Sequence, residues 1–299
     1  MNLAMAAIGD LLASGQHRLD RVGIENARRE ARLLLAAALD RSWGDLVGRE
    51  EQPVAPETAA RFEDFVRRRS RHEPVSRILG RREFWSLDFG LSAATLDPRA
   101  DSETLIEAVL ETVADRDAPL SILDLGCGTG CLLLALLSEL PNAKGIGVDL
   151  APLAVATASA NAARLGLERR ARFRIADWDS GLAGRFDIVV SNPPYIPAAE
   201  IATLAPEVVL HDPHLALDGG PDGLAAHRRL ARIIPRRLAA GGIAVVEHGD
   251  EQGPAAQAIY EAGGLTLRKW RADLGGHWRC LVMARKAAKK TVGKAGTTV

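Results

Sequence analysis

The chain has 299 residues and a mass of 32.0 kDa, and its 38 basic side chains are balanced by 38 acidic ones. Apolar residues make up 47% of the sequence and charged residues 25%, which excludes a chain that is mainly disordered. Zero net charge argues against a protein that coats nucleic acid or membrane through bulk charge. No apolar run approaches the roughly 18 residues of a membrane span, and the amino terminus lacks the basic start of a secretory signal.

The three cysteines are Cys127, Cys131 and Cys280. An odd number in a chain of this size implies no disulfide framework, so we expect a cytoplasmic protein. Cys127 and Cys131 have no second pair of cysteines or histidines to complete a ligand set, so we expect small packing residues and no metal site.

Residues 1–82 have the periodicity of helices and little strand character. Their apolar residues form one-sided stripes, and Pro56 is suited to the first turn of a helix. We therefore predict a small all-helical domain over 1–82. Arginines crowd its last part, a pattern typical of a solvated helix face that would also suit an acidic patch or RNA: Arg67, Arg68, Arg69, Arg71, Arg77, Arg81 and Arg82.

Residues 83–97 alternate apolar and polar side chains around a glycine, which predicts a β-hairpin that links two domains. No long linker rich in Pro, Gly and Ser is present, so we expect the domains to be held together rather than freely tethered. The second domain is predicted over 98–285. Residues 286–299 contain basic side chains and no acid, which predicts a disordered basic tail.

From Pro119 onward, short runs rich in Val, Ile and Leu alternate with helical patterns. This rhythm predicts an α/β domain with a mostly parallel, seven-stranded sheet and helices on both faces. The last two runs lie close together and could form an antiparallel edge pair. The predicted strands are Ser121–Leu125, Gly145–Asp149, Arg172–Ile175, Phe186–Ser191, Gly242–Glu247, Leu265–Arg268 and Arg279–Met283.

The first strand is followed by a glycine-rich loop, Asp124-Leu-Gly126-Cys-Gly128-Thr-Gly130, and then by a helix that begins at Cys131. A dinucleotide fingerprint requires glycine where Cys131 stands, and a P-loop requires a lysine that is absent. The spacing fits the D-x-G-x-G-x-G loop of Rossmann-like methyltransferases. A tight structural turn is the alternative interpretation.

Asp149 ends the second strand, where an acid is placed to bind ribose hydroxyls. S-adenosylmethionine contains a ribose and no phosphate, so it suits a glycine loop that lacks a phosphate-binding lysine. Asp177 and Trp178 follow the third strand. We expect Asp177 to accept a hydrogen bond from the adenine amine and Trp178 to pack on the ring, although a surface turn would also explain them.

The fourth strand ends at Ser191 and is followed by Asn192-Pro193-Pro194-Tyr195. The two prolines fix φ and remove two backbone donors, so that rigidly aimed carbonyl groups remain. The Asn192 side chain and the Pro193 carbonyl could accept both hydrogens of a planar –NH2 group, whose lone pair would then face the methyl donor. Tyr195 adds an aromatic face. A proline-stiffened turn is the structural alternative.

At these residues the chain resembles methyltransferases that act on amino or amide nitrogen, which include DNA adenine-N6 and protein glutamine-N5 enzymes. Other segments resemble the HemK/PrmC-type protein-(glutamine-N5) methyltransferases over nearly the whole chain. In this chain the family's P-R-P-x-T-E segment is Pro98-Arg-Ala-Asp-Ser-Glu103. The other segments are Glu73–Gly80, Glu83-Phe-Trp, Asp218–Leu224 and Glu247-His-Gly249 with Gln252.

This resemblance implies a Rossmann-like class I methyltransferase that uses S-adenosyl-L-methionine. Its implied substrate is the glutamine of the Gly-Gly-Gln motif in class 1 peptide-chain release factors, docked in part by the helical domain. The implied catalytic residues are Asn192, Pro193, Pro194 and Tyr195. The implied cofactor-binding residues are Gly126, Cys127, Gly128, Thr129, Gly130, Asp149, Trp178 and Asn192.

Three other functions fit the sequence less well. A DNA adenine-N6 methyltransferase would need a target-recognition domain, and the sequence contains no basic insert interleaved with aromatic residues, so we expect no direct DNA binding. A binding module without turnover would not need the intact acceptor motif. A small-molecule methyltransferase would leave the helical domain unexplained. We also expect no association with membranes.

Overall fold

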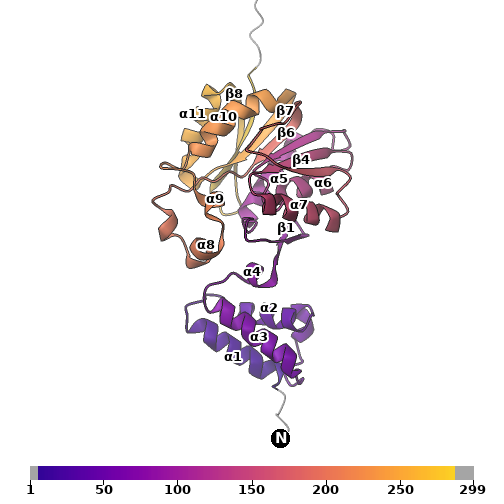
Figure 1. Ribbon diagram of the computed structural model, residues 1–299, viewed down its shortest axis with the longest axis vertical. Coiled ribbons are helices and arrows are strands. Elements are labelled where there is room, and N and C mark those ends of the chain that lie inside the picture. Colours follow the sequence, from indigo (N-terminus) through magenta and orange to yellow (C-terminus); the bar gives the residue numbers. More distant parts are fainter. Residues whose placement is uncertain (1–5, 287–299) are drawn as a thin grey trace, which may run out of the picture.

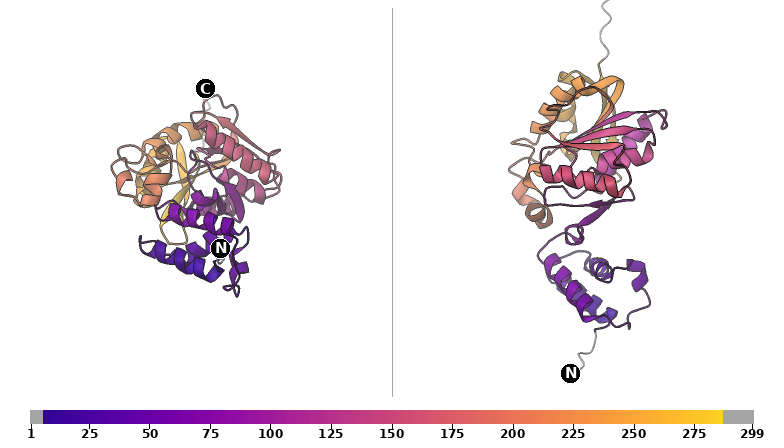
Figure 2. Two further views of the ribbon diagram at one scale, coloured as in Figure 1. Left: turned by 60° about the horizontal axis from the view of Figure 1, so that its bottom comes forward. Right: turned by 45° about the vertical axis from the view of Figure 1, so that its right-hand side comes forward.

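The structure is a computed structural model that describes residues 6–286. The predicted basic tail therefore lies outside the described residues, except for Lys286. Figure 1 shows two parts in series, with the amino-terminal helices at the bottom and a larger α/β domain above them. A helical turn and a hairpin lie between the two parts, and the right-hand view of Figure 2 shows how far the helical domain extends from the rest.

The amino-terminal domain is all-helical, as predicted. It contains α1 (Ile8–Asp20), α2 (Ala27–Ala38), the 3-10 helix η1 (Trp43–Leu46), α3 (Pro56–Arg69) and α4 (Val75–Leu79). The apolar stripes of these helices meet in one core. Gly15 lets α1 approach α3 closely, because a Cβ at this position would lie 2.6 Å from the Phe62 ring.

The connecting hairpin consists of β1 (Arg81–Phe84) and β2 (Leu87–Gly90), which are antiparallel. It is shorter than the predicted 83–97 and begins two residues earlier. The chain leaves the ladder after Gly90 because Ser92 and Thr95 close a turn on themselves, in which the Ser92 N–H donates to Thr95 Oγ1 at 3.0 Å.

The hairpin is fixed to the α/β domain by both apolar and polar contacts. The Phe84 and Phe89 rings meet edge to face with centroids 6.2 Å apart, and both belong to the core under the sheet. The Asn161 side chain on α7 (Pro152–Arg164) binds the backbone of Gly90 at 2.9 and 3.1 Å. The connection is therefore packed rather than loose.

The α/β domain contains one seven-stranded sheet of order β5-β4-β3-β6-β7-β9-β8. All neighbours pair in parallel except β9, which is antiparallel to β7 and β8, so the predicted mostly parallel sheet with an antiparallel edge pair is confirmed. The strands are β3 (Ser121–Leu125), β4 (Lys144–Asp149), β5 (Ala171–Ile175), β6 (Phe186–Ser191), β7 (Leu238–Glu247), β8 (Leu265–Ala272) and β9 (Trp278–Arg285).

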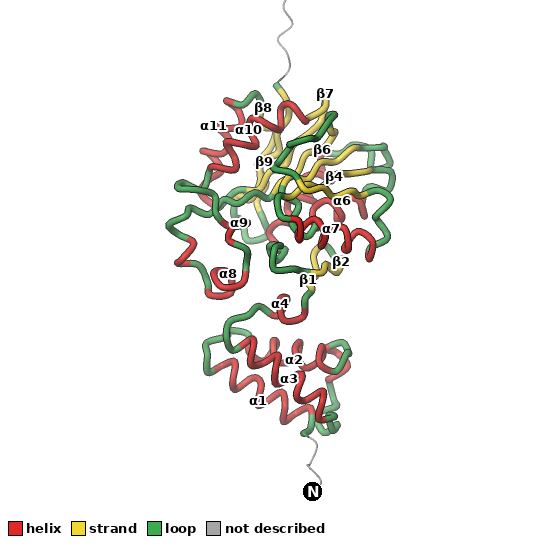
Figure 3. Tube along the Cα trace, in the orientation of Figure 1, coloured by secondary structure: helices red, strands yellow, loops and turns green. Residues whose placement is uncertain are grey.

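Helices cover both faces of this sheet, as Figure 3 shows in red around the yellow strands. One face packs against α5 (Glu103–Thr112), α6 (Cys131–Glu139) and α7, and the other against α10 (Ala225–Arg237) and α11 (Gly253–Ala262). Within residues 6–286, no helix combines the length and the apolar character that crossing a bilayer requires. The short elements are η2 (Ala100–Ser102), η3 (Ile201–Thr203), α8 (Pro206–His211), α9 (His214–Leu217) and η4 (Asp250–Gln252).

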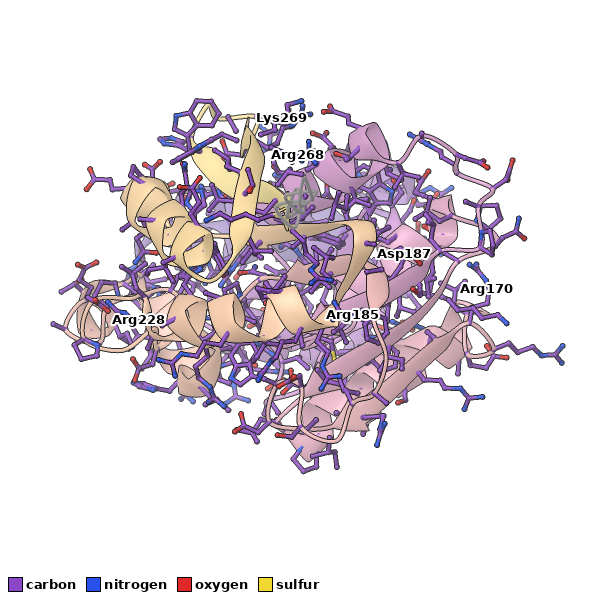
Figure 4. All side chains as sticks on the ribbon, turned by 90° about the horizontal axis from the view of Figure 1, so that it is seen from above. Arg170, Arg185, Asp187, Arg228, Arg268 and Lys269 are labelled. Carbon is purple, nitrogen blue, oxygen red and sulfur yellow. The ribbon has the colours of Figure 1, made fainter. Side chains whose placement is uncertain are left out.

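The amino-terminal edge of the sheet has a structural role. Figure 4 views this edge and labels Arg170, Arg185 and Asp187 on it. Arg170 donates to the carbonyl oxygens of Leu137, Leu140 and Ala143, Arg185 donates to that of Leu238, and Asp187 accepts from the backbone and side chain of Ser121. These charged groups satisfy backbone and hydroxyl groups where the strands begin.

Ion pairs join the helical domain to the α/β domain through α8 and the residue that follows it. The Arg69 guanidinium binds Glu30 in its own domain and Glu207 on α8, the latter at 3.0 Å. The Arg77 guanidinium donates to one oxygen of Asp212 at 2.7 Å, and Arg99 pairs with the other. Much of the arginine cluster seen in the sequence is thus engaged in ion pairs.

We predict that Arg77→Ala lowers the free energy of unfolding by about 3 kcal/mol. The Arg77 side chain is only 9% exposed and Asp212 is 1% exposed, so the substitution leaves a buried carboxylate with one partner fewer. It also removes the donor for two backbone carbonyls, those of Ser92 and Thr95. Urea unfolding measures the change.

The matched control is Arg71→Ala, because the exposed Arg71 side chain makes no hydrogen bond or ion pair with residues 6–286. A loss for Arg77→Ala that is no larger than the loss for this control would contradict the structural role of the pair.

Candidate active site

A cavity of about 430 Å³ opens at the carboxyl-terminal edge of the sheet. Ligands of open α/β sheets bind at this edge, because the loops after parallel strands gather there. The loops after β3, β4, β5 and β6 all contribute to the cavity, together with η2, α9 and the start of α10. Among its lining residues are Leu96, Pro98, Arg99, Ser102, Gly126, Cys127, Gly128, Thr129, Asp149, Asp177, Trp178, Asn192, Pro194, Pro213, Leu215 and Arg229.

The glycine loop lies along one wall of this cavity. Gly126, Gly128 and Gly130 have φ angles of 77°, 52° and 79°, a conformation that residues with a side chain adopt only at a cost. At Gly130 a Cβ would also lie 2.9 Å from the Phe173 ring, so the helix that begins at Cys131 could not pack as it does.

Asp149 fixes the loop from the end of β4. The Gly128 N–H donates to its Oδ2 and the Ala151 N–H to its Oδ1, both at 2.9 Å. A carboxylate has about four acceptor positions, so two remain for hydroxyl groups of a ligand in the cavity that Asp149 lines. This arrangement suits a ribose.

Trp178 and Arg229 form a second wall. Trp178 has a φ of 55°, and its ring comes within 3.9 Å of the position that a Cβ on Gly126 would occupy. The Arg229 guanidinium lies 5.7 Å from the centre of this ring and donates to both oxygens of Asp177 at 2.8 Å. Asp177, expected to meet an adenine amine, is therefore already held by Arg229. The sequence carried no signal for Arg229, because it lies on α10, far along the chain.

The Asn192–Tyr195 segment leaves the end of β6 in a fixed conformation. Asn192 and Pro194 line the cavity, whereas Pro193 is buried and the half-buried Tyr195 lies beside it. The Tyr195 carbonyl accepts a hydrogen bond from Gln252 Nε2 at 2.8 Å. No hydrogen bond from residues 6–286 reaches the carbonyl oxygen of Pro193, which leaves it free as an acceptor.

A hydrogen-bond chain runs behind this segment. Asn192 Nδ2 donates to Ser102 Oγ at 2.9 Å, and the Ser102 hydroxyl donates to Glu247 Oε2 at 2.6 Å. The Tyr195 hydroxyl donates to the other oxygen, Glu247 Oε1, at 3.2 Å. The sequence analysis gave no role to Ser102 or Glu247. Glu247 ends an apolar strand as Asp149 does, so the same rule would have identified it.

The cysteines of the loop are unsuited to nucleophilic chemistry. Burial raises the pKa of the Cys131 thiol to about 12, and that of Cys127 also lies well above its usual range. Only a thiolate is an effective nucleophile, so both side chains remain protonated at neutral pH. What the cavity offers is a set of oriented acceptors, an aromatic face and a carboxylate.

Comparisons with known proteins agree with this geometry. Residues 10–80 match the family model of the PrmC N-terminal domain, and residues 90–221 match that of the methyltransferase small domain. A release factor glutamine methyltransferase of Rhodospirillum rubrum is 50% identical over 284 residues, which cover 94% of this chain and 86% of the relative. Another from Cereibacter sphaeroides is 46% identical over 93% of this chain and 98% of its own.

The chain belongs to the release factor glutamine methyltransferase family. Identity at this level over nearly the full length of both proteins decides the assignment, which the sequence motifs predicted. The α/β domain is also similar to the hMettl16 catalytic domain in complex with MAT2A 3'UTR hairpin 6, with a TM-score of 0.54 and 14% identity over 69% of this chain and 77% of that one. This likeness concerns the fold alone. The match to the methyltransferase small domain and the seven-stranded, mostly parallel sheet confirm the Rossmann-like class I methyltransferase fold.

A buried carboxyl group below the glycine loop gives this methyltransferase a pH-dependent stability. Burial raises the pKa of the Asp124 carboxyl to about 7, and the nearby Leu133 N–H offsets this only in part, since neither carboxyl oxygen has a hydrogen bond of ordinary geometry within residues 6–286. Between its ordinary value of 3.8 and about pH 7, the folded protein keeps a proton that the unfolded chain has lost. Raising the pH through this range therefore destabilises the fold.

We predict that Asp124→Asn removes this dependence. The unfolding free energy of the variant relative to the wild type should rise by about 1.4 kcal/mol for each pH unit between pH 4 and 7, and then level off. Urea unfolding of both proteins at several pH values, without added ligand, measures the difference. A difference that stays constant across this range would show that Asp124 is ionised in the fold.

Proposed function

We propose that this enzyme transfers a methyl group from S-adenosyl-L-methionine to the side-chain amide nitrogen (N5) of the glutamine in the Gly-Gly-Gln motif of class 1 peptide-chain release factors. The observation that carries the proposal is a pair of adjacent acceptors: the side chain of Asn192, which lines the cavity, and the carbonyl oxygen of Pro193, which accepts no hydrogen bond from residues 6–286. The release factor glutamine methyltransferases that match more than 90% of the chain support the same substrate.

The cavity fits the proposed cofactor by the chemistry of its donor and acceptor set. Asp149 keeps acceptor positions for the ribose, the Trp178 ring offers a face for the adenine, and the loop Gly126–Gly130 brings backbone close to the ligand. Cys127 and Thr129 belong to that loop, and Asn192 completes the set from β6. Bound S-adenosylmethionine supplies an electrophilic methyl group on a positively charged sulfur.

The protein's own contribution is orientation. An amide nitrogen is a weak nucleophile because its lone pair is delocalised into the carbonyl group. Asn192 Oδ1 and the Pro193 oxygen accept both of its N–H hydrogens, so the lone pair is directed at the methyl carbon for an in-line displacement. Pro194 stiffens the segment and Tyr195 packs against the glutamine side chain. Transfer breaks the bond between the methyl group and sulfur, releases S-adenosylhomocysteine and leaves a cationic amide nitrogen. This nitrogen is acidic enough to give a proton to water, so no ordinary general base is needed beside it.

Transfer of labelled methyl from S-adenosylmethionine to a purified release factor tests the proposal. The factor is used with its Gly-Gly-Gln glutamine intact or replaced by alanine. We expect label only on the intact factor. Label that persists after the replacement would refute the assigned atom. Label that appears on adenine-containing DNA, and on neither factor, would replace the proposed substrate.

Asn192→Ala should lower kcat by about 100-fold or more, because it removes one of two groups that orient the nitrogen. The Kd for S-adenosylmethionine, measured by calorimetry, should change by only a few-fold. Asn142→Ala is the matched control, since within residues 6–286 the side chain of this exposed asparagine binds only one group, the carbonyl oxygen of Asp117. Full turnover by the Asn192 variant would contradict the proposed role of the side chain.

A further inference from the structure

The hydrogen-bond chain behind Asn192 and Tyr195 ends on one buried carboxyl group. Glu247 is 1% exposed, and its two oxygens receive the hydroxyl groups of Ser102 and Tyr195. Ser102 is 3% exposed and also holds the Asn192 amide. Three segments far apart in the sequence are joined at this point: the loop after β6, the end of β7 and the 3-10 helix η2 before α5.

The donors and acceptors of this chain can be ordered in only one way when Glu247 is ionised. A carboxylate accepts hydrogen bonds and donates none, so the Ser102 hydroxyl must give its hydrogen to Glu247. The Ser102 oxygen is then left as an acceptor, and only the NH2 group of Asn192 can bind it. The Asn192 carbonyl oxygen must consequently face away from Ser102, toward the cavity that Asn192 lines.

We propose that Ser102 and Glu247 are positioning residues for methyl transfer: the Glu247 carboxylate sets the direction of the hydrogen-bond chain, and Ser102 transmits it to Asn192, whose carbonyl oxygen is thereby presented to the substrate amide. The inference rests on the proposed function for its substrate. The Tyr195 hydroxyl is held by the same carboxylate, so both sides of the acceptor site depend on Glu247.

Protonation of Glu247 removes this constraint. A protonated carboxyl can donate to Ser102, whose hydroxyl can then donate to Asn192 Oδ1, and the amide turns its NH2 group toward the cavity. Burial raises the pKa of Glu247 to about 7, while the bond from Ser102 and the charge of Arg279 lower it. The other titratable and charged groups around Glu247 are Asp101, Cys131, Tyr195, Arg279 and Cys280.

Arg279 does not neutralise Glu247 by direct pairing. Its guanidinium is shared between Asp273 at 2.8 Å and Asp101 at 3.3 Å. Glu247 is therefore held by neutral hydroxyl groups, and its charge is free to respond to pH. Activity should fall on acidification as Glu247 takes up a proton.

The first test compares Ser102→Ala with Ser102→Thr in methyl transfer to the release factor. Alanine removes the hydroxyl group that links Glu247 to Asn192 and should lower kcat at least tenfold. The Kd for S-adenosylmethionine should stay within about twofold of the wild-type value. Threonine keeps the hydroxyl and should restore most of kcat. If the wild-type enzyme methylates the release factor and Ser102→Ala does so at the same rate, the inference is wrong and the proposed function stands.

The second test needs no substrate. The side-chain NH2 signals of Asn192 in a nitrogen-15 spectrum are assigned by their loss in Asn192→Ala. In the wild type, their chemical shifts should change with pH as Glu247 takes up its proton. They should not follow this titration in Ser102→Ala or Glu247→Gln. Glu251→Gln is the matched control, because this exposed side chain makes no hydrogen bond or ion pair within residues 6–286, and it should leave the titration and kcat unchanged. Asn192 signals that titrate equally in all variants would overturn the inference.

Discussion

The structure depends on one geometric constraint, that the carboxyl ends of β3, β4, β6 and β7 meet at a single edge of a parallel sheet. The glycine loop follows β3 and Asn192 follows β6, whereas Asp149 ends β4 and Glu247 ends β7. The apolar residues of these strands pack in the core and fix the position of the edge, so the polar groups are already close to one another. Catalysis by orientation requires such rigidity, because a small misplacement of the acceptors would turn the nitrogen lone pair away from the methyl carbon.

The helical domain is coupled to this edge through charge. Arg77 comes from α4, and the carboxylate that it shares with Arg99 belongs to Asp212, whose neighbour Pro213 lines the cavity together with Arg99. A movement of the helical domain would therefore be transmitted to two residues of the cavity wall. Of the arginine cluster that the sequence left open between a solvated helix face, an acidic patch and RNA, Arg69 and Arg77 form ion pairs with acidic residues of the α/β domain.

The mostly parallel sheet, its helices on both faces and the residues of the loops after β3, β4 and β6 could be predicted, because period, glycine spacing and position after a strand are local signals. The hairpin bounds could not, since Ser92 and Thr95 form a turn that competes with the ladder. Arg229 and Ser102 reach the site from a helix and a 3-10 turn distant in sequence, and their roles arise only from contacts. Asp177 is predicted to accept a hydrogen bond from the adenine amine, and the sequence could not show that Arg229 also binds this carboxylate.

A crystal structure with S-adenosylhomocysteine and a Gly-Gly-Gln peptide would test the central claim most directly. We expect the glutamine amide nitrogen to lie within hydrogen-bond distance of both Asn192 Oδ1 and the Pro193 oxygen, while Asn192 Nδ2 still donates to Ser102. A glutamine amide bound away from both oxygens, or an Asn192 side chain that turns its NH2 group to the peptide, would contradict it.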